Sequence, residues 1–189
     1  PQGDVIYRNE TSTRFLDSSS DRITVANHSD LQIDGEDFSV SFWVKLTEDA
    51  SSTSNKDGII GIKAGQFRQG GFWFEYQDDA GDDQHIVMYT STTGNKTYIA
   101  STGDAIADDT WYHVVATYDL STTTAVLYLN GSVTKTNTSM NEPTAYTGTV
   151  YLGSASSYVS ADVCELALWK GYALTSGDVT HLYDGGFGA

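Results

Sequence analysis

The densest cluster of carboxylates lies in a short polar segment between two apolar stretches. Its members are Asp78, Asp79, Asp82 and Asp83. Carboxylates crowded on one turn repel one another unless they are solvated or bind a cation. Carboxylates and turn carbonyls are ligands that Ca²⁺ prefers, although this spacing is not that of an EF-hand loop. The segment therefore predicts either a solvated turn or a calcium site.

Four aromatic residues lie on predicted strands close to this acidic segment and are the candidate ligand-binding residues: Trp73, Tyr76, Tyr89 and Tyr98. Side chains alternate between the two faces of a strand. Trp73, Glu75 and Gln77 therefore share one face, and the aromatic residues that alternate with them share the other. A face that combines an aromatic ring with polar groups suits an exposed groove. The alternative is that Trp73 packs in a core or at a sheet edge.

Sequence motifs for catalysis are absent. A glycoside hydrolase uses two carboxylates, and on a strand these must be two residues apart to share a face. Glu75 is followed at that spacing by Gln77, and Glu165 is followed by Ala167. The motifs of serine hydrolases, zinc proteases and phosphate-binding loops are also missing. The sequence predicts that the protein is not an enzyme.

The composition is strongly acidic, with 25 Asp and Glu residues against 10 Lys and Arg residues and a formal net charge of −15. Such acidity serves solubility, or it reflects a divalent cation site or a salty environment. Duplex nucleic acid and anionic membranes require clustered Lys and Arg, so neither is an expected partner. No apolar run approaches the ~20 residues of a membrane helix, so membrane insertion is not expected either.

Hydrophobic periodicity places the candidate residues on strands. A period of two, with turn residues between the runs, recurs along the chain. Phe15 and Ile23–Val25 mark an early strand pair, and the later strands are Phe38–Leu46, Gly58–Ile62, Gly71–Gln77, Gln84–Thr90, Thr97–Ala100, Trp111–Tyr118, Thr124–Asn130, Thr149–Leu152 and Val163–Trp169. This pattern, without a linker, predicts one all-β domain, residues 1–189, folded as an antiparallel two-sheet β-sandwich or jelly roll.

Two of these strands carry more detailed predictions. In Phe38–Leu46, one face is apolar, and the other combines Trp43 with polar side chains. That pattern predicts a half-buried strand. In the strand that starts at Trp111, we expect Trp111 to anchor the core and His113 to be a hydrogen-bonded structural residue.

Two local signals mark a turn and a helix. The dipeptide Asn130-Gly131 predicts a type I′ hairpin turn, because both residues tolerate a positive φ. Thr175 followed three residues later by Asp178 has the form of a capping box. Apolar residues then recur at helical spacing up to Gly185, so one short helical turn is expected near the end of the chain.

Four segments of the chain match, in order, the motifs of one family. They are Arg14–Val25, Phe38–Lys45, Trp111–Gly131, and Val150–Gly153 continued by Val163–Tyr183. They are similar to an opening F-D-G…D-x-I-x-V, a strand F-T-I-S-x-W-V-K, a hairpin W-x-H-V-A-x-T-Y-D…L-Y-x-N-G, and an ending I-G…I-D-E-V-R-I-Y-x-R-A-L-S. The set resembles the laminin-G-like domains of the concanavalin A-like jelly-roll fold, in the branch related to pentraxins.

The resemblance implies noncatalytic, lectin-like recognition of a glycan or a glycosylated surface, outside cells or on virions. It suggests that Trp73, Tyr76, Tyr89 and Tyr98 stack on the C–H faces of sugars. The alternative is a structural or interaction module, such as a virion decoration or fibre protein or an adhesin, that packs against a protein partner. An aromatic-floored groove would favour the first function, and a broad apolar patch would favour the second.

The family ending also bears on calcium. Where relatives have I-D-E-V, this chain has Val163-Cys164-Glu165-Leu166, and a thiol cannot replace a carboxylate as a ligand of Ca²⁺. A structural calcium site implied by the resemblance would therefore depend on other carboxylates: Asp17, Asp21, Asp162 or Glu165. Cys164 is the single cysteine, so no intrachain disulfide can form, and its apolar surroundings predict a buried, inert thiol.

Overall fold

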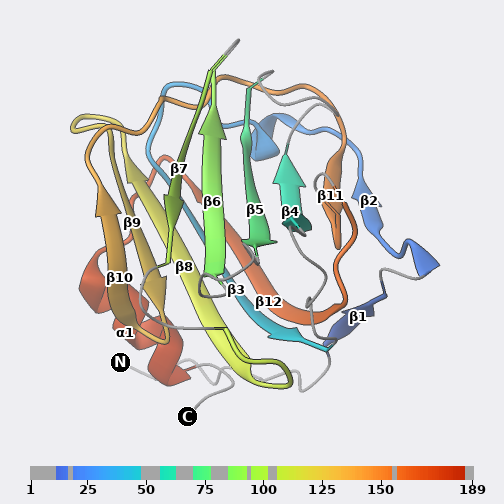
Figure 1. The fold of residues 1–189 in the computed structure, drawn as a ribbon. Helices are drawn as coiled ribbons and strands as arrows, with labels where there is room; N and C mark the ends of the chain where they lie inside the picture. Colours follow the sequence, from blue (N-terminus) through green and yellow to red (C-terminus); the bar gives the residue numbers. More distant parts are fainter. Residues whose placement is uncertain are drawn as a thin grey trace, which may run out of the picture.

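The computed structural model describes residues 12–16, 19–47, 56–62, 70–77, 85–92, 95–101, 106–154 and 157–185. They form two six-stranded sheets that stack as a sandwich (Figure 1). The first sheet has the order β1 (Thr13–Phe15), β12 (Ala161–Lys170), β3 (Phe38–Leu46), β8 (Trp111–Asp119), β9 (Thr124–Leu129) and β10 (Ser132–Asn137). The second has the order β2 (Ile23–Val25), β11 (Val150–Leu152), β4 (Lys56–Ile62), β5 (Phe72–Gln77), β6 (His85–Ser91) and β7 (Lys96–Ala100). Neighbouring strands are antiparallel, which confirms the predicted sandwich.

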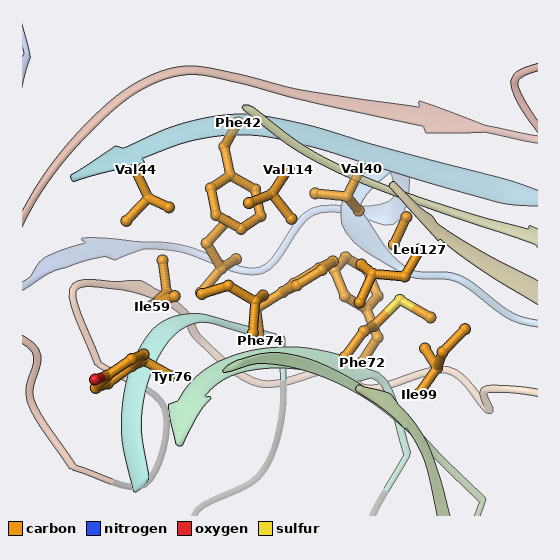
Figure 2. Close-up of a cluster of buried hydrophobic side chains, with 14 of the residues drawn as sticks. Val40, Phe42, Val44, Ile59, Phe72, Phe74, Tyr76, Ile99, Val114 and Leu127 are labelled. Carbon is orange, nitrogen blue, oxygen red and sulfur yellow. The ribbon is translucent and has the colours of Figure 1, made fainter. Parts of the chain in front are cut away.

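The main core lies between the two sheets, which contribute alternate side chains from their central strands (Figure 2). Phe42 of β3 meets Phe74 of β5 edge to face, with ring centroids 5.1 Å apart, and Phe38 stacks on Phe72 at 5.0 Å. Each such pair adds ~0.5–1.5 kcal/mol to the stability gained from burial alone. Tyr76 of β5 is fully buried in the same layer, so it faces the core and is not available to a ligand.

A second, smaller core covers the outer face of the first sheet. Val115 and Tyr128 pack there against Leu174 and against Val179 of helix α1 (Ser176–Gly185). The main core buries the inner face of β3, and Tyr183 of α1 stacks on Trp43 of its outer face, so the prediction that β3 is half-buried is wrong. Alternation identified the two faces correctly, but a strand pattern does not show that a later helix will cover the polar one.

Helix α1 begins at the predicted capping box. The backbone N–H of Asp178 donates to Thr175 Oγ1 at 3.2 Å, and the backbone N–H of Thr175 donates to Asp178 Oδ2 at 2.8 Å. These reciprocal bonds satisfy two donors that a helix start leaves unpaired. The helix has ten residues, so it is longer than the single turn that was expected. A 3₁₀ turn, η2, spans Ser29–Leu31.

The ends of the chain pair differently from the prediction. Phe15 and Ile23–Val25 were expected to form one strand pair, but β1 pairs with β12 and β2 pairs with β11, in opposite sheets. We expected Trp111 to anchor the core, and this prediction is wrong. Trp111 is half-buried on the outer face of β8, whereas the core face of β8 carries Val114 and Ala116. Lys45 Nζ lies 5.5 Å from the Trp111 ring centroid instead.

The predicted hairpin turn joins β9 and β10. Asn130 and Gly131 have φ angles of 48° and 77°, and Leu129 pairs with Ser132 across the turn. A type I′ turn requires a positive φ at both central residues, as found here, so the prediction is confirmed. Asn130 Oδ1 also accepts a hydrogen bond from the backbone N–H of His113 at 2.9 Å, which ties the turn to β8.

Candidate functional site

A row of aromatic side chains crosses the outer face of the second sheet. Strand pairing aligns Trp73 of β5 with Tyr89 of β6, and Tyr89 with Tyr98 of β7. The Trp73 and Tyr89 rings stack with centroids 4.7 Å apart and planes 8° from parallel, and the Tyr98 ring follows at 5.7 Å from Tyr89. The structure thus brings together three of the four aromatic residues that the sequence indicated.

Exposure differs sharply along this row. Trp73 is 0% exposed and Tyr89 is 4% exposed, whereas Tyr98 on the edge strand β7 is 58% exposed. The face of Trp73, Glu75 and Gln77 was expected to form an exposed groove, but all three residues are buried. The alternative stated for Trp73, packing rather than direct contact with a ligand, therefore describes its place in the fold, and Tyr98 is the ring of the row that solvent reaches.

Buried polar groups hold the inner part of the row in place. Trp73 Nε1–H donates to Glu75 Oε1 at 2.9 Å, and Gln77 Nε2–H donates to Glu75 Oε2 at 3.2 Å and to the Tyr89 hydroxyl. Hydrogen bonds in a low-dielectric interior are electrostatically strengthened and fix side-chain orientation. The network therefore gives Tyr98 a fixed aromatic neighbour.

A polar groove lined by residues of β7 and β10 lies beside Tyr98. These two strands are neighbouring edge strands of the two sheets (Figure 1). The volume of the groove is about 680 Å³, within the range of ~300–1,000 Å³ that is usual for ligand sites. The lining residues are Lys96, Thr97, Tyr98, Ile99, Ala100, Lys135, Thr136, Asn137 and Thr138. The groove therefore combines one exposed aromatic ring with several polar side chains.

Asn137 joins the two walls of this groove. Its Nδ2–H donates to the backbone carbonyl of Tyr98 at 2.9 Å, and its Oδ1 accepts from the backbone N–H of Ser139 at 2.9 Å. The Nδ2 group thus links β10 to β7, and the Oδ1 atom is engaged by the backbone just after β10. On the other side, Lys96 Nζ lies 4.4 Å from the centroid of the Tyr89 ring.

A family model described as the concanavalin A-like lectin/glucanases superfamily matches residues 17–180. The chain belongs to this superfamily. No curated protein matches it by sequence. Its fold is that of a concanavalin A-like jelly roll, in agreement with the resemblance noted from the sequence.

Several solved structures share this superfamily fold at low sequence identity. The binding domain of botulinum neurotoxin serotype D has a TM-score of 0.70 and 17% identity, covering 94% of this chain and 45% of that one. A heptameric SAP-like pentraxin from Limulus polyphemus has a TM-score of 0.63 and 18% identity, covering 96% and 81%. Domain 4 of AbnA, an extracellular arabinanase from Geobacillus stearothermophilus, in complex with arabinotriose, has a TM-score of 0.61 and 20% identity, covering 93% and 83%. The chain spans less than half the length of the botulinum domain.

The residues named as candidate calcium ligands divide into two groups. Asp17, Asp78, Asp79, Asp82 and Asp83 lie outside the described residues. Asp21, Asp162 and Glu165 are described, and they do not gather into one cluster. Within the described ranges, no group of three or more His, Cys, Asp or Glu side chains could hold a metal ion.

The Asp162 carboxylate forms ion pairs with two basic side chains, Arg14 and Lys45. Arg14 Nε–H and Nη2–H donate to its two oxygens at 2.7 and 2.9 Å, and Lys45 Nζ lies 3.1 Å from Oδ2. The hydrogen bonds from Arg14, supported by Lys45, lower the pKa of the Asp162 carboxyl. The pair joins β1 and β3 to β12, so Asp162 acts as a structural residue.

Asp21, Glu165 and Cys164 lie in three different environments. Asp21 Oδ2 accepts from the backbone N–H of Leu16 at 3.3 Å. Glu165 is exposed on a bulge of β12, with a φ of 51°. Cys164 is buried, as predicted, and burial raises the pKa of its thiol to about 11, so it is protonated and unreactive at neutral pH.

Sequence reasoning did not identify Lys135 and Asn137 as site residues. They lie on β10, almost 40 positions beyond Tyr98 along the chain, and their strand pairs with β9 rather than with β7. Only the sheet order shows that β7 and β10 are the edge strands on one side of the sandwich. The strand itself was not predicted, and the pairing of Lys135 and Asn137 with the core residues Leu127 and Ala125 is seen only in the structure.

Proposed function

We propose that this domain is a noncatalytic carbohydrate-binding module, which recognises a glycan or a glycosylated surface at the groove between β7 and β10. The observation that carries the proposal is Tyr98. It is 58% exposed, lies in line with the buried Tyr89–Trp73 stack, and forms a wall of the polar groove. An exposed ring next to a buried aromatic stack and polar side chains suits sugars, whose C–H faces are apolar and whose hydroxyls require hydrogen bonds.

The fold neighbours support the same class of function. One of them, domain 4 of an arabinanase, was solved in complex with arabinotriose, and another is a toxin binding domain. Both are similar to this chain in fold alone, so their ligands are not transferred to it. Such a role places the domain outside cells or on a virion surface. No helix in the described ranges is long and apolar enough to cross a membrane.

Catalysis does not fit the groove as it is described. Glycoside hydrolysis requires two carboxyl groups ~5–10 Å apart on either side of the bond that is cleaved. The groove is lined by no Asp or Glu among the residues that the structure describes. The proposal is therefore one of binding without turnover.

An interaction module is the second candidate, and one observation favours it. A smaller groove of about 220 Å³ lies at the opposite edge of the sandwich, between β1, β2, β11 and β12. Its lining is largely apolar and includes Phe15, Ile23 and Leu166, of which Ile23 and Leu166 are partly exposed. An apolar edge suits a protein partner in a larger assembly better than a sugar.

A glycan-array screen of the intact chain, run once with calcium and once with chelator, tests the proposal. We expect binding to one class of glycan that the Tyr98→Ala variant loses. Tyr172→Ala is the matched control, because Tyr172 is also an exposed tyrosine (48%) but does not line the groove. Loss of binding in chelator alone would support the calcium site predicted from the acidic residues. Binding to no glycan in either condition would overturn the proposal in favour of the interaction module.

A further inference from the structure

The groove beside Tyr98 has a charge opposite to that of the whole chain. The chain has 25 acidic and 10 basic residues. Two of those basic residues, Lys96 and Lys135, line the groove, and within the described ranges it has no acidic lining residue. A net charge of −15 repels anions at a distance, so a pair of ammonium groups with no carboxylate among the described lining residues differs from the charge of the chain as a whole.

Lys135 lines the groove from β10. It follows the bulge at Val133 in β10 and pairs with Leu127, whose side chain faces the core. The Lys135 side chain therefore lies on the inner side of its sheet, at the edge that neighbours β7. It is exposed, and no ion pair involves it among the described residues. Lys45 and Lys170, in contrast, are paired with carboxylates.

Lys96 is held against the aromatic row. Its Nζ lies 4.4 Å from the Tyr89 ring centroid and 6.0 Å from that of Trp73, both within reach of a cation–π interaction. An ammonium group positioned by fixed rings loses little freedom when it contacts a ligand. The two lysines thus belong to opposite walls of the groove, with the Tyr98 ring on the wall of Lys96.

From this arrangement we infer that the groove selects anionic glycans, whose sugars carry a carboxylate or a sulfate group. The inference rests on the proposed function and narrows its ligand class. A sugar ring stacked on Tyr98 would bring an acidic substituent toward Lys135 or Lys96, which donate charge-assisted hydrogen bonds. Asn137 uses both ends of its amide within the protein, so it shapes the groove and leaves recognition to the lysines and threonines.

Two matched pairs of oligosaccharides test the charge directly. Oligogalacturonate is compared with its methyl ester, and a sulfated galactan oligosaccharide is compared with the unsulfated one. Titrations are run in chelator, so that calcium bridges between acidic sugars do not contribute. We expect at least one acidic form to bind about tenfold more tightly than its neutral counterpart, with a difference that shrinks as salt rises. The pair that responds tells whether carboxylate or sulfate is recognised.

Variants separate this inference from the proposed function. Lys135→Gln and Lys96→Gln should each weaken binding of the acidic form about fivefold and leave the neutral form unchanged. Lys170→Gln removes the same charge away from the groove and should have no effect. If acidic and neutral forms bind equally and Tyr98→Ala weakens both, the charge inference is overturned and the glycan site stands. If neither form of either pair binds, with calcium or in chelator, the charge inference is overturned, and the glycan array decides the proposed function separately. Unchanged melting temperatures of the variants confirm that they are folded.

Discussion

The indole of Trp73 and the ring of Tyr89 stack almost parallel, 4.7 Å apart, in a buried layer on the outer face of the second sheet. Trp73, which the sequence indicated as a ring for stacking on sugars, is thus part of a buried, hydrogen-bonded cluster on this face. In the proposed site its role is indirect, because it positions Tyr89 beside Tyr98 and beneath Lys96.

Trp73→Ala should therefore act first on stability. Removing a fully buried indole leaves a cavity and takes one hydrogen-bond donor from the buried Glu75 carboxylate, and such changes cost about 3–5 kcal/mol. Urea denaturation should show this loss in free energy of unfolding, whereas Tyr98→Ala should change it by less than about 1 kcal/mol. A Trp73→Ala protein as stable as the wild type, but unable to bind glycan, would make Trp73 a contact residue instead.

His113 should make the fold sensitive to acid. It is buried between Trp43 and Tyr183, with Nε2 2.9 Å from Ser41 Oγ, and burial lowers its pKa from the ordinary 6.5 to about 4. Between these two pH values the unfolded chain binds a proton that the folded chain does not. The contribution of neutral His113 to the free energy of unfolding should therefore be fully present above about pH 6.5. It should be lost as the pH drops toward 4, by up to about 3 kcal/mol.

Chemical denaturation at a series of pH values measures this slope. His113→Gln should remove it between pH 6.5 and 4 while leaving the lower range, where Asp162 and other carboxylates titrate, unchanged. A wild-type protein whose free energy of unfolding stays flat down to pH 4 would contradict a neutral His113.

Asp162 should prove to be structural and independent of calcium. Asp162→Asn removes the partner of Arg14 and Lys45, and we expect it to cost about 1–3 kcal/mol, because Asp162 is buried whereas Arg14 is largely exposed. The melting temperature should fall by the same amount in calcium and in chelator. A loss seen in calcium alone would identify Asp162 as a metal ligand.

Gly131 should tolerate no side chain. Its φ is 77°, and a Cβ there would lie 3.0 Å from Tyr183 Cδ1 of helix α1. Gly131→Ala should lower the free energy of unfolding by about 1–3 kcal/mol through backbone strain and displacement of Tyr183. Gly177→Ala is the matched control, because a Cβ there meets nothing closer than 3.7 Å and α1 should gain about 0.5–1 kcal/mol. Equal effects of the two substitutions would contradict this account of the turn.

Local patterns predicted every strand except β10, together with the Asn130-Gly131 turn and the capping box at Thr175, because each depends on residues close together in the chain. The pairing of β1 and β2 was predicted wrongly, because strands adjacent in sequence usually pair, and here they belong to opposite sheets. Alternation told the two faces of β5 apart, but it did not show which face is covered. The burial of Trp73 and the exposure of Tyr98 follow from the order of strands in the sheet.

The groove itself was beyond sequence reasoning for the same reason. Tyr98 and Asn137 come together only because β7 and β10 are both edge strands on one side of the sandwich. The acidic segment Asp78–Asp83, the most prominent chemical signal in the sequence, lies outside the described residues, so its calcium site stays a prediction.

The most direct measurement of the central claim is a map of backbone amide shifts by NMR during titration of the intact chain with the glycan it binds most strongly on the array. The account predicts the largest shifts along β7 and β10, at Lys96–Ala100 and Lys135–Thr138, and their disappearance in the Tyr98→Ala variant. Shifts centred instead on the apolar groove of Phe15, Ile23 and Leu166, and unaffected by Tyr98→Ala, would contradict it.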